Sequence, residues 1–228
     1  MKDKRVYGFF DVDGTLVQFK TMLRFMWFYQ IYLTRSYSWL GQLRYGLFRL
    51  HLKFLEKIGK NRSYLNYCYY RYFKRHRLKT VEHVATVWFR WELRNRNTVF
   101  HHHVVKELQR LQQQKVKVVL VSGSFTSCLK GVAKYLGVDT ILASRLETEE
   151  GGILTGKLLP PQTIGAGKVR AIHDFLCQES ESVDLSDSFA YGDHISDLPM
   201  LELVGHPIVV RGDHQLEQQA LSRQWAMI

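Results

Sequence analysis

The stretch Phe9-Phe10-Asp11-Val12-Asp13-Gly14-Thr15 decides the fold, and it lies near the start of a 228-residue chain. Residues 5–10 form a short, largely apolar run that favours extended backbone, which predicts a buried β-strand. Asp11 and Asp13 then lie at the end of that strand, before a turn that Gly14 permits. Because neighbouring positions on a strand alternate between faces, the two carboxylates can share one site only if the backbone coils here.

Oxygen atoms grouped in this way suit Mg²⁺, which binds one or two carboxylates together with the phosphate oxygens of a substrate. An acidic junction between a strand and a turn is also ordinary turn chemistry. Taken alone, the stretch leaves a metal site and a plain turn equally open.

The second half of the chain alternates between predicted strands and helices. We expect an amphipathic helix from about residue 98, helices over 127–136 and 165–177, and a hairpin around 151–159. Strands are expected over 116–121, 139–143, 188–191 and 207–210, with the last of these ending the sheet. This alternation predicts an α/β fold with a doubly wound parallel sheet, whose ligands bind at the carboxyl ends of the strands.

Residues 20–96 differ from the rest in composition. They hold 17 Lys or Arg and three acids, a net charge of +14, whereas the rest of the chain has a net charge of −3. They also contain 19 of the 30 aromatic residues. Their helical periodicity predicts an inserted all-α unit of about four helices. We therefore predict an α/β core formed by residues 1–19 and 97–228, with a helical cap over residues 20–96.

Within this insertion, residues 47–60 are expected to form a basic amphipathic helix. Phe48, Leu52 and Leu55 share one apolar face, and Leu47, Leu50, Phe54 and Ile58 lie beside it. Arg49, Lys53, Lys57 and Lys60 line the other side.

The cysteines and the N-terminus bear on the compartment. Cys68, Cys128 and Cys177 are far apart and form no Cys-x-x-Cys pair, which favours a reducing environment. A charged N-terminus runs directly into the first strand, so we expect no signal peptide. The chain lacks an uncharged apolar run of about 18 residues, so we expect no spanning helix and a cytoplasmic location.

Polar groups follow three of the predicted strands or begin an adjacent helix. Acids, a hydroxyl and an ammonium group gathered at strand ends are typical of a site for phosphate and Mg²⁺. In such a site one carboxylate can act as a nucleophile and form an aspartyl-phosphate. The groups are Asp11, Asp13, Ser122, Lys168, Asp193 and Asp197.

These groups fall into four motifs: Asp11-Val-Asp-Gly-Thr15, Val121-Ser-Gly-Ser124, Gly167-Lys-Val169, and Gly192-Asp193 with Asp197. In this order they resemble the four motifs of the haloacid dehalogenase (HAD) superfamily. The chain is most similar to subfamily IB, the phosphoserine-phosphatase-like hydrolases, and the similarity covers essentially the whole chain. The resemblance implies a Rossmann-like HAD core with a helical cap of type C1 between the first and second motifs.

The resemblance also implies roles for individual residues. Asp11 would be the nucleophile and Asp13 the general acid and base, while Ser122 and Lys168 would hold the phosphoryl group. Mg²⁺ would be bound by Asp11, the backbone carbonyl of Asp13, and Asp193, with support from Asp197. Thr15 and Gly123 would shape the loops around the substrate. The implied activity is that of an Mg²⁺-dependent phosphomonoester phosphatase.

Two positions depart from the pattern of phosphoserine phosphatases. Lys20 stands nine residues after the nucleophile, where those enzymes carry a glutamate that faces the substrate, and Ser124 replaces a usual glycine. Phosphoserine is therefore not the expected substrate. A basic, aromatic cap favours a small acidic or aromatic phosphomonoester, or a lipid phosphate resembling phosphatidylglycerophosphate.

A different class of function is a basic nucleic-acid-binding or membrane-binding protein that retains a relic HAD core. No recognised nucleic-acid-reading motif is present, and every expected catalytic position is filled, so an enzyme is favoured. Peripheral contact of the basic cap with the inner face of a membrane stays open. His194, next to Asp193, receives no role from the sequence.

Overall fold

The computed structural model describes residues 5–34, 37–179 and 182–228, and these contain a seven-stranded sheet of order β4-β3-β2-β1-β5-β6-β7. Only the β3–β4 pair is antiparallel. The sheet confirms the predicted α/β fold with a doubly wound, mainly parallel arrangement. Its strands are β1 (Tyr7–Phe10), β2 (Lys117–Phe125), β3 (Thr140–Glu149), β4 (Ile153–Leu159), β5 (Phe189–Gly192), β6 (His206–Val209) and β7 (Ala226–Met227).

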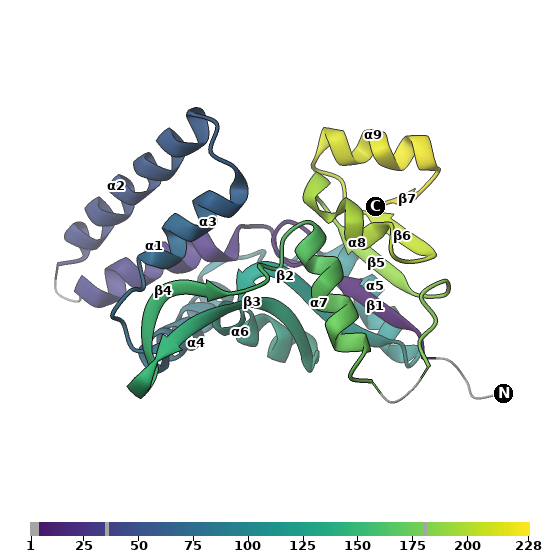
Figure 1. Ribbon diagram of the computed structural model, residues 1–228, viewed down its shortest axis with the longest axis horizontal. Helices are drawn as coiled ribbons and strands as arrows, with labels where there is room; N and C mark the ends of the chain where they lie inside the picture. The colour runs from purple at the N-terminus through teal and green to yellow at the C-terminus, as the bar shows by residue number, and fades with distance from the viewer. Residues whose placement is uncertain (1–4, 35–36, 180–181) are drawn as a thin grey trace.

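Helices cover both faces of the sheet (Figure 1). Successive side chains of β1 explain why: Phe9 packs into an apolar cluster with the helices on one face, and Phe10 packs into a second cluster on the other. One face is covered by α7 (Ala166–Leu176), α8 (Leu198–Leu201) and α9 (His214–Arg223), and the other by α5 (His102–Gln113) and α6 (Thr126–Leu136).

Four helices follow one another between β1 and α5 in the described part of the chain, as the sequence predicts. They are α1 (Thr21–Thr34), α2 (Ser38–Lys57), α3 (Arg62–Arg71) and α4 (Leu78–Asn95). Helices α1–α3 gather at one end of the molecule, whereas α4 returns beside α6 (Figure 1). The rings of Phe25 in α1 and Phe125 in β2 lie 5.5 Å apart. The insertion therefore shares one continuous apolar core with the sheet.

Two local predictions are wrong. The strand expected over residues 116–121 extends farther, because β2 continues through Ser122-Gly123-Ser124 to Phe125, and its pairing with β3 is irregular between Ser122 and Phe125. The strand near residue 207 is not the last, because α9 and the two-residue strand β7 follow it. Helix α9 contains few apolar residues, so its hydrophobic periodicity is weak. The Asp213 carboxylate caps its N-terminus by accepting hydrogen bonds from the backbone N–H groups of Gln215 and Leu216.

No helix in residues 5–34, 37–179 or 182–228 combines the length and apolar character needed to cross a bilayer.

A buried carboxylate joins α1 to α4. Glu92 accepts hydrogen bonds from Arg24 Nε at 3.0 Å and from the indole nitrogen of Trp88 at 2.9 Å. Its side chain is fully buried, and Arg96 adds a second cation at 3.9 Å. A buried carboxylate is stable only when its oxygens are paired, so this contact links α1 to α4 at a defined position.

We expect Glu92→Ala to lower the free energy of unfolding by about 2–3 kcal/mol, because it leaves the buried indole N–H without an acceptor and the arginines without their partner. Urea denaturation measures the loss. Glu82→Ala is the matched control on the same helix, since Glu82 pairs with Lys130 at the surface, and it should cost less than about 1 kcal/mol. Equal losses for the two variants would contradict the role assigned to Glu92.

Candidate active site

Strand β1 lies between β2 and β5, so residues at the carboxyl ends of these three strands meet at one edge of the sheet. Asp11 follows β1, Ser122 lies in β2, and Asp193 follows β5. A small cavity of about 40 Å³ opens between them. Seven of the residues predicted from the motifs line it: Asp11, Asp13, Ser122, Gly123, Lys168, Asp193 and Asp197.

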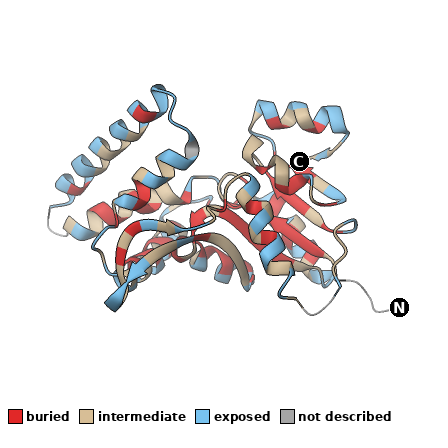
Figure 2. Cartoon of the chain, in the orientation of Figure 1, coloured by how far each residue is buried: buried red, intermediate tan, exposed pale blue. Residues whose placement is uncertain are grey.

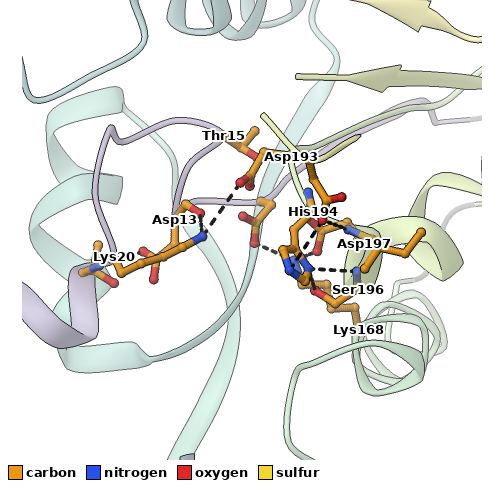
Figure 3. A network of polar contacts seen from close by, with 12 residues as sticks. Asp13, Thr15, Lys20, Lys168, Asp193, His194, Ser196 and Asp197 are labelled. Carbon is orange, nitrogen blue, oxygen red and sulfur yellow. Dashed lines mark hydrogen bonds and ion pairs between the residues drawn. The ribbon is translucent and has the colours of Figure 1, made fainter. Parts of the chain in front are cut away.

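Lys168, in the first turn of α7, is buried between two carboxylates. Its ammonium lies 2.5 Å from Asp11 Oδ1. It also lies 2.8 Å from Oδ1 of Asp197, which is labelled beside it in Figure 3. Burial opposes the charge, but the two acids outweigh it and hold the pKa of Lys168 above its ordinary value. Burial also raises the pKa of Asp197, and Lys168 acts against that change. The ammonium is thus a fixed positive charge at the floor of the cavity.

Asp193 approaches the first motif so closely that a side chain at position 14 is excluded. A Cβ on Gly14 would lie 2.3 Å from Asp193 Oδ2, and the backbone φ of Gly14 is +102°, a value that L-residues rarely adopt. Thr15 is fully buried, and its hydroxyl donates to Asp193 Oδ1 at 2.9 Å. Thr15 therefore holds an acid in place instead of lining the cavity.

The acidic residues of the site are of the kind that binds a divalent cation. Carboxylate oxygens of Asp11, Asp193 and Asp197 all lie within 4.8 Å of one another. A cluster of hard oxygen atoms beside an open cavity suits Mg²⁺, which retains ligand positions for substrate oxygens. The predicted set differs in one member, because it takes the backbone carbonyl of Asp13 in place of Asp197.

Asp13 lies on the side of the cavity that faces the helical insertion. Its carboxylate accepts a hydrogen bond from the backbone N–H of Thr21 at 3.1 Å, and its carbonyl accepts one from Lys20 Nζ at 2.7 Å (Figure 3). The pKa of Asp13 is raised to about 6, and burial is the main cause. The hydrogen bond from Thr21 acts in the opposite direction, and the charge of Asp11 adds to the increase. A carboxyl with such a pKa can both give and take a proton near neutral pH.

Ser122 and Gly123 form another part of the cavity wall. Ser122 Oγ accepts a hydrogen bond from the backbone N–H of Ser124 at 3.1 Å. The Gly123 carbonyl accepts hydrogen bonds from the hydroxyls of Tyr70 and Ser144. These bonds hold the irregular part of β2 in place beside the cavity.

A second, larger cavity of about 500 Å³ adjoins the first. Both are lined by Asp13, Lys20, Met22, Asn66 and His194, so the two cavities are neighbours that share a wall. The larger cavity lies among α1, α2 and α3. Its lining combines the basic residues Lys20, Arg49, Lys53 and Lys60 and the acid Glu56 with the apolar residues Met22, Leu23, Leu52 and Leu65. Met22 and Asn66 were not predicted, because a methionine and an asparagine within helical segments carry no motif signal.

Lys20 is one of the two departures from the phosphoserine-phosphatase pattern, and it lines both cavities. Besides its bond to the Asp13 carbonyl, its ammonium lies 3.8 Å from Asp193 Oδ2. His194 also lines both cavities, and its Nδ1 accepts a hydrogen bond from the backbone N–H of Ser196 at 3.1 Å. That bond caps the short helical turn that carries Asp197.

Comparison with known proteins agrees with this arrangement. Residues 9–202 match the haloacid dehalogenase-like hydrolase family. The "Inhibition of morphological differentiation protein" of Streptomyces azureus is 36% identical over 111 residues, which are 49% of this chain and 39% of that protein. The phosphoserine phosphatase of Streptococcus thermophilus is 36% identical over 101 residues, 44% of this chain and 46% of that enzyme. The match thus spans less than half the length of either relative.

A crystal structure of a protein of unknown function from Bordetella pertussis Tohama I has the same fold. It superposes with a TM-score of 0.82 at 20% sequence identity and covers 99% of both chains. The similarity to phosphoserine phosphatases that the motifs predict is confirmed by these comparisons. The chain belongs to the haloacid dehalogenase-like hydrolase family.

Proposed function

We propose that the protein is an Mg²⁺-dependent phosphatase of phosphomonoesters that works through an aspartyl-phosphate on Asp11. The observation that carries the proposal is the meeting of Asp11, Lys168 and Ser122 around one small cavity. A nucleophilic carboxylate, a buried ammonium and a hydroxyl supply an attacking oxygen and two groups that hold phosphoryl oxygens.

In the first step Asp11 attacks phosphorus, and the bond from phosphorus to the leaving oxygen breaks while Asp13 gives that oxygen a proton. In the second step Asp13 takes a proton from water, which attacks phosphorus and releases Asp11 and inorganic phosphate. The pKa of about 6 at Asp13 supports both duties. Lys168 and Ser122 hold the phosphoryl oxygens throughout, and Gly123 lets this part of β2 lie close to Ile164, because an added Cβ would be 2.7 Å from Ile164 Cγ1.

We assign the Mg²⁺ site to Asp11, Asp193 and the backbone carbonyl of Asp13, with Asp197 orienting Lys168. When bound, the cation would offset the negative charge of the phosphoryl group. Thr15 would keep the Asp193 carboxylate aimed at the cation.

The larger cavity would receive the rest of the substrate, beneath a cap domain that we assign to residues 20–96, over a core of residues 1–19 and 97–228. Its basic and apolar lining favours a small phosphomonoester with a second anionic group, and phosphoserine is disfavoured because Lys20 repels the serine ammonium. A phosphorylated lipid headgroup is the second candidate, since Leu52 and Leu65 offer apolar contact beside the cations. The filled catalytic positions argue against a relic core that binds nucleic acid.

We place the enzyme in the cytoplasm. The three cysteines stay unpaired in the fold, with Cys128 buried in the core and Cys177 at the surface, which suits a reducing compartment.

The purified protein should hydrolyse p-nitrophenyl phosphate when Mg²⁺ is present and lose this activity when the cation is chelated. Asp11→Asn should reduce hydrolysis to background, because an amide is a poor nucleophile. Asp13→Asn should lower kcat by about 10²–10⁴-fold, the usual contribution of a general acid and base. Thermal unfolding of each variant controls for folding. Full activity of Asp11→Asn would refute the nucleophile.

The larger cavity predicts a selective effect of Lys53→Ala. For a substrate with a second anionic group, KM should rise by about fivefold, which corresponds to one partly exposed ion pair of about 1 kcal/mol. Hydrolysis of p-nitrophenyl phosphate should be unchanged. Lys57→Ala is the matched control, because Lys57 lies on the same helix and is exposed but does not line the cavity.

Steady-state kinetics on a panel of phosphorylated metabolites, with phosphatidylglycerophosphate included, supplies the substrates for this test. An equal change in KM for Lys53→Ala and Lys57→Ala would mean that general surface charge, and not the cavity, attracts the substrate.

A further inference from the structure

Helix α2 carries a continuous apolar stripe on its outer face. Trp39, Leu43, Leu47, Leu50, Phe54 and Ile58 are spaced by three or four residues, so they line one side of the helix. Each of these six side chains is between 51% and 64% exposed. Because soluble proteins seldom expose large apolar residues in a contiguous row, this outer stripe, as we call it, calls for a partner.

The inner face of α2 is packed, so the outer stripe is not the result of a helix turned the wrong way. Gly41 lies so close to α1 that an added Cβ would be 2.8 Å from the Gln30 carbonyl oxygen. Phe48 packs edge-on against Tyr69 and Tyr72, and Leu55 is buried. Leu47, Leu50, Phe54 and Ile58, which the sequence places beside the packed face, instead point away from it.

Positively charged residues of α2 flank the outer stripe. The helix carries Arg44, Arg49, Lys53 and Lys57 against the single acid Glu56. At helical spacing Arg44 falls on one flank of the stripe, while Lys53 and Lys57 fall on the other. The helix also forms the outer edge of the molecule, away from the sheet, with mostly exposed residues along its length (Figures 1 and 2).

We propose that the outer stripe of α2 docks on the surface of an anionic lipid bilayer, with the helix lying in the plane of the interface. An apolar stripe flanked by cations is the arrangement that places side chains among acyl chains and ammonium or guanidinium groups among anionic headgroups. Each cation near such a surface adds to the attraction. The proposal concerns docking and does not depend on the phosphatase chemistry.

Charge argues against a second copy of the chain as the partner. An isologous contact would bring two α2 helices together, each with four cations and one acid, and their like charges would face each other across the interface. A nucleic acid would satisfy the cations but would leave the outer stripe in water.

Flotation of the full chain with vesicles tests the proposal. The protein should bind vesicles that contain phosphatidylglycerol and should bind pure phosphatidylcholine vesicles much more weakly. Leu50→Glu combined with Phe54→Glu should weaken binding by about tenfold or more, because it places two acids in the apolar face. These residues line neither cavity of the active site, so hydrolysis of p-nitrophenyl phosphate should stay at the wild-type rate.

Leu221→Glu is the matched control, since Leu221 on α9 is 66% exposed but lies far from α2 (Figure 1). It should bind vesicles as the wild type does. Trp39 supplies a direct readout: vesicles should shift its fluorescence to shorter wavelength, and Trp39→Phe should remove that shift.

Several results would overturn the proposal. Absence of binding to phosphatidylglycerol vesicles would do so, as would equal binding by the wild type and the double variant. Light scattering that shows a dimer, which the double variant converts to a monomer, would assign the outer stripe to a second copy if vesicles leave the Trp39 signal unchanged.

Discussion

The active site depends on the buried ammonium of Lys168, which lies between Asp11 and Asp197. Several carboxylates gathered within a few ångströms repel one another and are costly to bury. One ammonium offsets this repulsion and at the same time joins the end of β1 to α7 and to the turn after β5. These links also place the other groups of the site. Asp193 directly precedes the turn after β5, and Ser122 lies in β2, the strand next to β1.

Close backbone approach is the second constraint, and it explains where glycine is required. A side chain on Gly14 would collide with the Asp193 carboxylate, and a Cβ on Gly192 would lie 2.7 Å from the Cβ of Asp197. Two glycines thus let Asp193 and Asp197, which both follow β5, lie within a few ångströms of Asp11 at the end of β1. The acidic cluster is therefore a property of the backbone path as much as of the carboxylates themselves.

The sequence predicts the sheet and the residues that meet at the site, because both are marked by short local sequence patterns. An apolar run followed by Asp, Gly or Ser marks a strand end, and the parallel arrangement brings strand ends together. The orientation of α2 could not be predicted in this way. Phe48, Leu52 and Leu55 form one apolar face, and Leu47, Leu50 and Phe54 form another at the same helical period. The packing of Gly41 against α1, and of Phe48 against Tyr69 and Tyr72, decides which of them is buried.

Helix α2 consequently has three faces, and their arrangement links the two proposals. Gly41, Phe48 and Leu55 pack inward, Arg49 and Lys53 line the larger cavity, and the outer stripe faces solvent. With the outer stripe on a bilayer, the cavity-lining face would lie close to the headgroups, because it adjoins the stripe on the same helix. An anionic headgroup phosphate would then meet Arg49 and Lys53 before it met Lys20, at the mouth of the catalytic cavity. The cations that would attract the protein to a membrane are in part the cations that would select its substrate.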